Sequence, residues 1–202
     1  MNRRGPLALL AILGAGCSST SGSPAAAANA NDAADMSADS AVAVSTEDID
    51  AGSADFDCLK NAEWTTVGLS RFKNVLGHTD ETLAVARSRD GGTFPVGTIV
   101  QLVPTEASVK RGAGFNAASH DWEFFTLNAT STGTTITARG GGASVVNFTG
   151  SSCLNCHDKA APQWDLLCGD QDGGNTHGCA PLPLTAAVLT SVQDSDPRCN
   201  DP

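Results

Sequence analysis

The residues most able to do chemistry are Cys-Leu-Asn-Cys-His at residues 153–157. Two thiols three residues apart on a helical turn can both reach the vinyl groups of one porphyrin and form thioethers with it. The following residue then presents its imidazole to the iron from the same side. The spacing predicts one covalently attached haem c, bound through Cys153 and Cys156, with His157 as an axial ligand of the iron.

Three other interpretations of this segment remain: a C-x-x-C redox pair, half of a zinc site, or two disulfide cysteines beside a surface histidine. A thioredoxin-like pair belongs in a βαβ context, which the sequence does not suggest. A zinc site needs a second well-spaced pair of cysteines or histidines. Residues 1–17, described next, predict export of the chain. Export favours haem, because c-type haem is attached outside the cytoplasm.

Residues 1–17 have the features of a secretory signal. Arg3 and Arg4 give a positive start, residues 7–13 form an apolar stretch far shorter than the roughly 20 residues of a membrane span, and small residues precede Cys17. A Cys in this place resembles the lipobox of bacterial lipoproteins. The resemblance implies a chain anchored to the outer membrane through lipid on Cys17, facing the periplasm or the cell surface. In the alternative, another peptidase cuts nearby and Cys17 is discarded or left free.

Residues 18–55 are rich in Ala, Ser, Asp and Gly, and they include acidic but no basic side chains. Such a segment cannot bury enough apolar surface to offset its ordering entropy. We therefore predict a disordered, solvated tether, followed by one folded domain over residues 56–202. The net charge of −10 argues against nucleic acid as a partner, because binding to phosphates needs a basic face.

The folded part is expected to be mainly β (α+β), an antiparallel sheet with short terminal helices, one of which carries the haem motif. Short apolar or alternating runs bounded by Gly, Pro and Asn predict strands at residues 82–86, 98–103, 122–127, 134–138 and 144–148. Helices are expected at residues 64–74, from about Ser152, and at residues 185–193, where Thr185 can cap the first turn.

The chain has seven cysteines. Lipid on one and haem on two would leave an even number in an oxidising compartment, which predicts two disulfides among Cys58, Cys168, Cys179 and Cys199. Four cysteines allow three connectivities, and sequence alone does not choose among them. We favour Cys168 with Cys179, which closes a Gly- and Asp-rich loop, and Cys58 with Cys199, which joins the two ends of the domain.

The second axial position of the iron is either open or filled by another histidine. The only methionines, Met1 and Met36, precede the predicted domain, so a His/Met cytochrome is disfavoured. The candidate second ligands are His78, His120 and His177.

Gly-Thr-Phe-Pro-Val-Gly-Thr at residues 92–98, Asp-Trp-Glu-Phe-Phe at residues 121–125 and the late haem motif together resemble the cytochrome P-460 family. The resemblance implies a β-rich monohaem domain, often a homodimer, with an open iron position that meets hydroxylamine, nitric oxide or similar ligands. It also implies a lysine cross-linked to haem on the strand after Phe-Pro-x-Gly-Thr. That strand here carries Gln101 and no lysine, and Lys73 and Lys110 are the nearest alternatives.

Three functions follow as hypotheses. The first is a haem protein for electron transfer to a redox protein partner or for binding small nitrogen-oxide ligands. The second is an enzyme that converts hydroxylamine or nitric oxide, with Glu106, Glu123 or Arg111 as a distal acid or base. The third is a haem-free lipoprotein held by disulfides. The aromatic residues Trp122, Phe124, Phe125 and Trp164 are expected in the core or against the haem.

Overall fold

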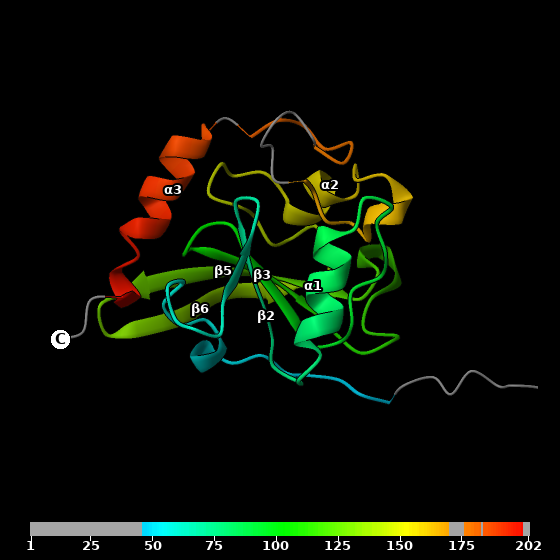
Figure 1. The fold of residues 1–202 in the computed structure, drawn as a ribbon, viewed down its shortest axis with the longest axis horizontal. Helices are drawn as coiled ribbons and strands as arrows, with labels where there is room; N and C mark the ends of the chain where they lie inside the picture. Colours follow the sequence, from blue (N-terminus) through cyan, green and yellow to red (C-terminus); the bar gives the residue numbers. More distant parts are fainter. Residues whose placement is uncertain (1–45, 170–175, 183, 200–202) are drawn as a thin grey trace, which may run out of the picture. The chain divides into compact units, whose positions relative to one another are not determined.

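The computed structural model describes residues 46–169, 176–182 and 184–199. Its centre is a six-stranded antiparallel sheet in which the strands are adjacent in chain order. The strands are β1 (Thr65–Val67), β2 (Ser70–Asn74), β3 (Thr98–Gln101), β4 (Glu106–Lys110), β5 (Trp122–Thr130) and β6 (Gly133–Gly140). The helices are α1 (Thr79–Arg87), α2 (Cys153–His157) and α3 (Ala186–Asp194) (Figure 1). The expectation of a mainly β, antiparallel fold is confirmed.

Two sequence expectations at the ends of the chain are confirmed. Helix α2 begins directly after Ser152, whose hydroxyl accepts a hydrogen bond from the backbone N–H of Asn155. Helix α3 begins directly after Thr185, whose hydroxyl accepts from the backbone N–H of Val188. Each cap satisfies an N–H group that has no partner within the helix.

The helix expected at residues 64–74 is wrong, because this segment forms the β1–β2 hairpin. Thr65, Thr66 and Val67 are β-branched and favour an extended backbone. Gly68 follows with φ +58, a conformation that permits the tight turn into β2. Strand β4 was not anticipated, and four of its five residues are small or polar.

The strand expected at residues 82–86 is also wrong, because these residues lie in α1. Asp80 and Glu81 in the first turn favour the helix, since acidic side chains stabilise a helix N-terminus. Residues 144–148 form no strand; Val146 only makes an isolated bridge to Ser152. A short apolar run does not distinguish a strand from one turn of buried helix.

Both faces of the sheet are buried. One face packs Ile99, Val109 and Phe125 against Phe56 and Trp64 from the N-terminal part. The other face carries a second cluster, formed by Phe72, Phe94, Val100, Trp122, Phe124, Val145, Cys153 and Leu166. Figure 1 shows α1 and α2 on this second side and the N-terminal segment on the opposite side. Burial from both sides explains why all residues of β3 are buried.

The ordered domain begins earlier than residue 56. Residues 46–55, here called the N-terminal strap, lie on the first face of the sheet, where Ala51 is completely buried. Asp48 forms an ion pair with Arg111, and Asp50 forms one with Arg139. These acidic residues are therefore counter-charges for Arg111, directly after β4, and for Arg139 in β6, which the sequence interpretation of a solvated tether missed. The signal segment, Cys17, Met36 and residues 18–45 lie outside the described residues.

Two disulfides are present, and both have the favoured connectivity. Cys58 and Cys199 are joined across 141 residues of sequence, and Cys168 and Cys179 across 11. The first ties the N-terminal part to the end of the chain. The second closes a loop beside α2, and part of that loop lies outside the described residues.

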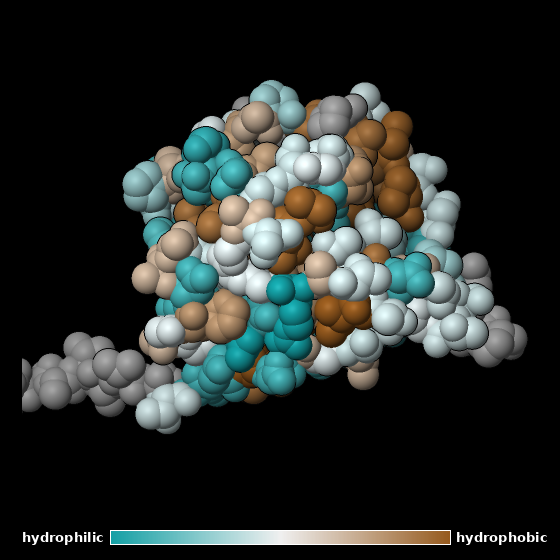
Figure 2. Space-filling view, turned by 180° about the vertical axis from the view of Figure 1, so that it is seen from behind, coloured by the Kyte–Doolittle hydropathy of each residue, from teal (hydrophilic) through white to brown (hydrophobic). Residues whose placement is uncertain are grey.

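The surface offers no extended apolar face in the view of Figure 2, where hydrophobic residues form separate small patches between hydrophilic ones. In the part of the chain that the structure describes, no helix is long and apolar enough to span a bilayer. The exposed large hydrophobic residues are Val146, Phe148, Val188 and Val192.

Candidate functional site

The three residues of the haem motif project from one short helix. In α2, positions i, i+3 and i+4 lie on one face, so Cys153, Cys156 and His157 are presented together. The backbone N–H of Cys153 donates to the carbonyl oxygen of Val145 at 2.9 Å, which attaches the start of the helix to the preceding loop. Both cysteines are free thiols; Cys153 is buried and Cys156 is partly exposed.

All three residues line one cavity between α2 and the sheet. Its empty volume is about 930 Å³, part of it open to solvent. Val100 and Phe124 contribute apolar walls from the sheet, and the Cys168–Cys179 disulfide lines another side. The motif therefore opens onto a space suited to a large, mostly apolar group.

His157 is held in an orientation suited to an iron ligand. Its Nδ1 lies 2.7 Å from the carbonyl oxygen of Leu166 and must carry the proton, because a carbonyl only accepts. Nε2 makes no hydrogen bond to a described residue, and its lone pair is left for a metal. Burial lowers the pKa of His157, an effect that the hydrogen bond to Leu166 opposes, and burial therefore favours the neutral imidazole that binds metals.

The thiol of Cys153 does not resemble a reactive redox cysteine. Burial, with a contribution from the negative charge of Glu106, raises the pKa of Cys153 to about 11. Redox-active cysteines in C-x-x-C motifs have lowered pKa values. The environment of Cys153 thus argues against the redox-pair interpretation of the motif.

Of the three candidate acid or base residues, only Glu106 lines the cavity. Burial raises its pKa, and the backbone N–H of Phe148, which donates to its carboxylate, partly offsets that rise. Glu123 lies on the other face of β5, where Arg111 and Arg139 neutralise it at 2.5 and 2.6 Å. Strand alternation explains this separation, because Glu123 precedes the cavity residue Phe124 and points the opposite way.

The three candidate second ligands do not line this cavity. His78 pairs with Glu47 at 3.0 Å, and His120 lies 3.7 Å from Asp165. His177 stacks on Trp164 with the ring centroids 3.7 Å apart.

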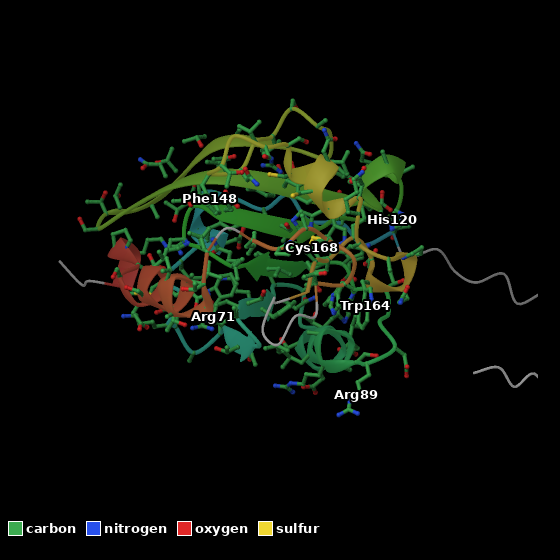
Figure 3. The ribbon with its side chains drawn as sticks, turned by 90° about the horizontal axis from the view of Figure 1, so that it is seen from above. Arg71, Arg89, His120, Phe148, Trp164 and Cys168 are labelled. Carbon is green, nitrogen blue, oxygen red and sulfur yellow. A yellow bond between two sulfur atoms is a disulfide. The ribbon has the colours of Figure 1, made fainter. Side chains whose placement is uncertain are left out.

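Trp164 and His177 border a second, neighbouring cavity, which shares Cys168 with the first. In Figure 3 the labelled Cys168 lies between Phe148, which borders the first cavity, and Trp164. Trp164 lines this neighbouring cavity and not the one shared by Cys153, Cys156 and His157, and its expected place near the haem edge stays a prediction.

Neither candidate lysine lines the cavity, and both are already paired. Lys73 lies on the opposite face of the sheet, with its ammonium 2.8 Å from Asp57. Lys110 binds both carboxylate oxygens of Asp165, at 2.9 and 2.8 Å. Gln101 is buried among backbone carbonyls, and its Oε1 lacks a hydrogen-bond partner among the described residues.

Sequence reasoning missed the segment that contacts His157 from behind. Asp165 and Leu166 both adopt left-handed backbone conformations, with φ +49 and +60. The Phe-Pro-x-Gly-Thr segment packs against them, because the backbone N–H of Phe94 donates to the Asp165 carboxylate. An aspartate one residue after Pro-Gln-Trp is compatible with a turn, but nothing local shows that its carboxylate is buried.

Within the described ranges, no group of three or more His, Cys, Asp or Glu side chains is placed to hold a metal ion. The described residues therefore do not assemble a zinc site around the motif. Iron in a porphyrin requires only one side-chain ligand from the protein, so the absence of a three-residue group does not bear on haem.

Comparisons of the chain with protein-family models, with curated proteins and with solved structures give no match.

Proposed function

We propose that this chain is an exported monohaem c-type cytochrome similar to the cytochrome P-460 family. The observation that carries the proposal is the joint placement of two free thiols and one imidazole with an available Nε2 on a single, largely apolar cavity. Cys153 and Cys156 would hold the porphyrin as thioethers, and His157 would bind the iron. The bound haem supplies an iron that changes oxidation state and can bind a small ligand.

The surroundings of the cavity support an open iron position. None of the other described histidines lines the cavity, and no methionine occurs after Met36. The walls are apolar near Val100 and Phe124 and polar near Ser108, Asn147 and Glu106. Such a cavity suits a small diatomic or hydroxylamine-like ligand, and electron transfer with a redox protein partner is equally compatible with it.

A second candidate function is conversion of hydroxylamine or nitric oxide. It is favoured by Glu106, the one acidic side chain that lines the cavity among the residues the structure describes. A carboxyl with a raised pKa holds its proton to higher pH than an ordinary glutamate does, which suits a proton donor. The pairing of Lys110 with Asp165 and of Lys73 with Asp57 does not favour a lysine cross-link to haem.

The remaining parts of the proposal rest on the sequence. Lipid on Cys17 would anchor the protein to the outer membrane, facing the periplasm or the cell surface, and a homodimer follows from the family resemblance. Both stay predictions. A haem-free lipoprotein held by its two disulfides is the alternative to the whole proposal.

The decisive experiment is expression with a haem-attachment system, followed by a haem stain on a denaturing gel. Wild-type protein is expected to retain haem, and the Cys153→Ser/Cys156→Ser double variant is expected to lose it, because no thioether can form. The matched control is Cys58→Ser/Cys199→Ser, which removes two cysteines outside the cavity and should keep the stain. Wild-type protein without covalent haem would overturn the proposal in favour of the disulfide lipoprotein.

Absorption spectra of the loaded protein then test the state of the iron. A high-spin spectrum that shifts on addition of nitric oxide is expected from an open position. A low-spin spectrum that does not respond would contradict the open position and leave electron transfer as the function.

A further inference from the structure

A buried ion pair lies behind the segment that contacts His157. The side chains of Lys110 and Asp165 are only 7% and 5% exposed, and the ammonium binds both carboxylate oxygens. The same ammonium donates to the carbonyl oxygen of His120 at 2.7 Å. The backbone N–H of Phe94 donates to the carboxylate at 2.9 Å from another loop. The carboxylate of Asp165 is thus held by both β4 and the loop before β3.

This carboxylate belongs to a strained turn. Aspartate tolerates the left-handed conformation of Asp165. Leucine rarely adopts such a conformation, yet Leu166 has φ +60. Such a conformation persists only where surrounding contacts over-determine it. Here the Asp165 carbonyl accepts from Nε1 of Trp122 at 2.6 Å, and the Leu166 carbonyl accepts from Nδ1 of His157 at 2.7 Å. The turn therefore directs two successive carbonyls at two side-chain N–H groups.

We propose that Lys110 and Asp165 are positioning residues for His157: they fix the turn that holds the Leu166 carbonyl on Nδ1. The inference rests on the proposed function, since His157 is an iron ligand only when haem is bound. A hydrogen bond from the far ring nitrogen orients a ligating histidine and raises its basicity. A more basic imidazole stabilises oxidised iron, so this contact would lower the reduction potential of a haem held through His157.

Stability alone does not account for this ion pair. Removing two charges from water is costly, and buried pairs are often replaceable by apolar side chains without loss of stability. Their best-attested role is to specify one arrangement of the chain. The half-exposed imidazole of His120, with Nδ1 3.7 Å from Asp165, is the other titratable group that faces the carboxylate.

The opposite face of the sheet supplies a matched control. There the ammonium of Lys73, itself buried, lies 2.8 Å from Asp57, and Nε1 of Trp64 donates to the same carboxylate oxygen at 2.8 Å. The Lys110, Asp165 and Trp122 cluster has the same three residue types, although Trp122 donates to the backbone carbonyl of Asp165 and not to its carboxylate. None of the contacts of Asp57 reaches His157.

The test uses haem-loaded wild type, Asp165→Asn, Lys110→Met and the control Asp57→Asn. Asparagine tolerates the left-handed conformation and can still accept from Phe94, so Asp165→Asn mainly removes the charge. The readouts are covalent haem, the midpoint potential and the iron–histidine stretching frequency in the reduced state. These last two report the bond between the ligand and the iron, which a merely structural role would leave unchanged.

Both Asp165→Asn and Lys110→Met are expected to keep covalent haem, to lower the stretching frequency and to raise the midpoint potential. The expected size is about tenfold in the equilibrium constant for reduction, which is 59 mV for a one-electron couple. Asp57→Asn should leave both properties at their wild-type values. If Asp165→Asn does not fold, Lys110→Met carries the test, because it leaves the turn sequence intact.

Two results separate the possible failures. Wild-type protein without covalent haem overturns the proposed function and this inference with it. Loaded variants with wild-type potential and stretching frequency, or an equal shift in Asp57→Asn, overturn only the positioning role.

Discussion

At the scale of single residues, neighbours in sequence have opposite environments in this domain. Glu123 is neutralised by two arginines on one face of β5, while Phe124 lines the haem-motif cavity on the other. Glu106 lies in the cavity with no cationic side chain bound to it among the described contacts. The face of the sheet that a carboxylate occupies therefore decides whether cationic side chains surround it.

The raised pKa of Glu106 leads to a testable effect on stability. Because its pKa in the folded state lies above the unfolded value, stability falls as the pH rises through the interval between the two. Glu106→Gln removes this cost, so we expect the variant to be more stable than wild type at pH 7 and to lose that advantage near pH 4.

Urea denaturation of haem-free protein at both pH values is the measurement. Asp90→Asn, at an exposed position, is the control and should show no such change. An advantage of Glu106→Gln that is equal at both pH values would show that packing, rather than charge, is the cause.

At the scale of elements, two segments outside the strands and α-helices make contacts that hold the sheet and the cavity in place. The turn at Asp165 and Leu166 contacts His157 and Trp122. The N-terminal strap covers the opposite face through Ala51 and through Asp48, which binds Arg111 and the backbone N–H of Gly112.

The strap is expected to loosen in acid. The hydrogen bond from Arg111 holds the pKa of Asp48 well below its usual range, so its contribution to docking is present above about pH 4 and is lost as the pH falls below that. The contribution is about 1 kcal/mol or less, because Asp48 is half exposed.

Limited proteolysis of the strap is the measurement. Cleavage should be faster at pH 3 than at pH 7 in wild type, and already fast at pH 7 in Asp48→Asn. Equal cleavage of wild type and Asp48→Asn at pH 7 would mean that Ala51 and its neighbours hold the strap without the ion pair.

At the scale of the whole molecule, the two disulfides join different parts of the fold. The Cys58–Cys199 bond closes almost the entire domain, whereas Cys168–Cys179 closes a short loop at the cavity. In the chain-entropy account, a disulfide that closes a longer loop removes more entropy from the unfolded chain.

Removal of each bond should therefore have different consequences. Cys58→Ser/Cys199→Ser is expected to cost about 5 kcal/mol of unfolding free energy and to leave haem attachment intact. Cys168→Ser/Cys179→Ser should cost about 3 kcal/mol and alter the haem spectrum, since this bond lines the cavity. Chemical denaturation and absorption spectra check both, and a reversed order of the two losses would contradict the loop-length argument.

Local chemistry made much of this protein predictable from its sequence. The spacing of Cys153, Cys156 and His157, the caps at Ser152 and Thr185, and the strands around residues 98–103, 122–127 and 134–138 all depend on near neighbours in the chain. An even count of leftover cysteines predicted two disulfides, and the pairing that closes one short loop and joins the two ends of the domain is the one observed.

Tertiary structure alone decided the rest, because the deciding contacts join residues far apart in sequence. At residues 65–74 and in helix α1, short apolar runs fit a strand and a helix equally well, and packing on the sheet decided between them. The sequence predicts a solvated carboxylate at Asp48, and only the fold places Arg111 beside it. Only the fold places Lys110 against Asp165 and Leu166 against His157, since burial and charge pairing are properties of the assembled core.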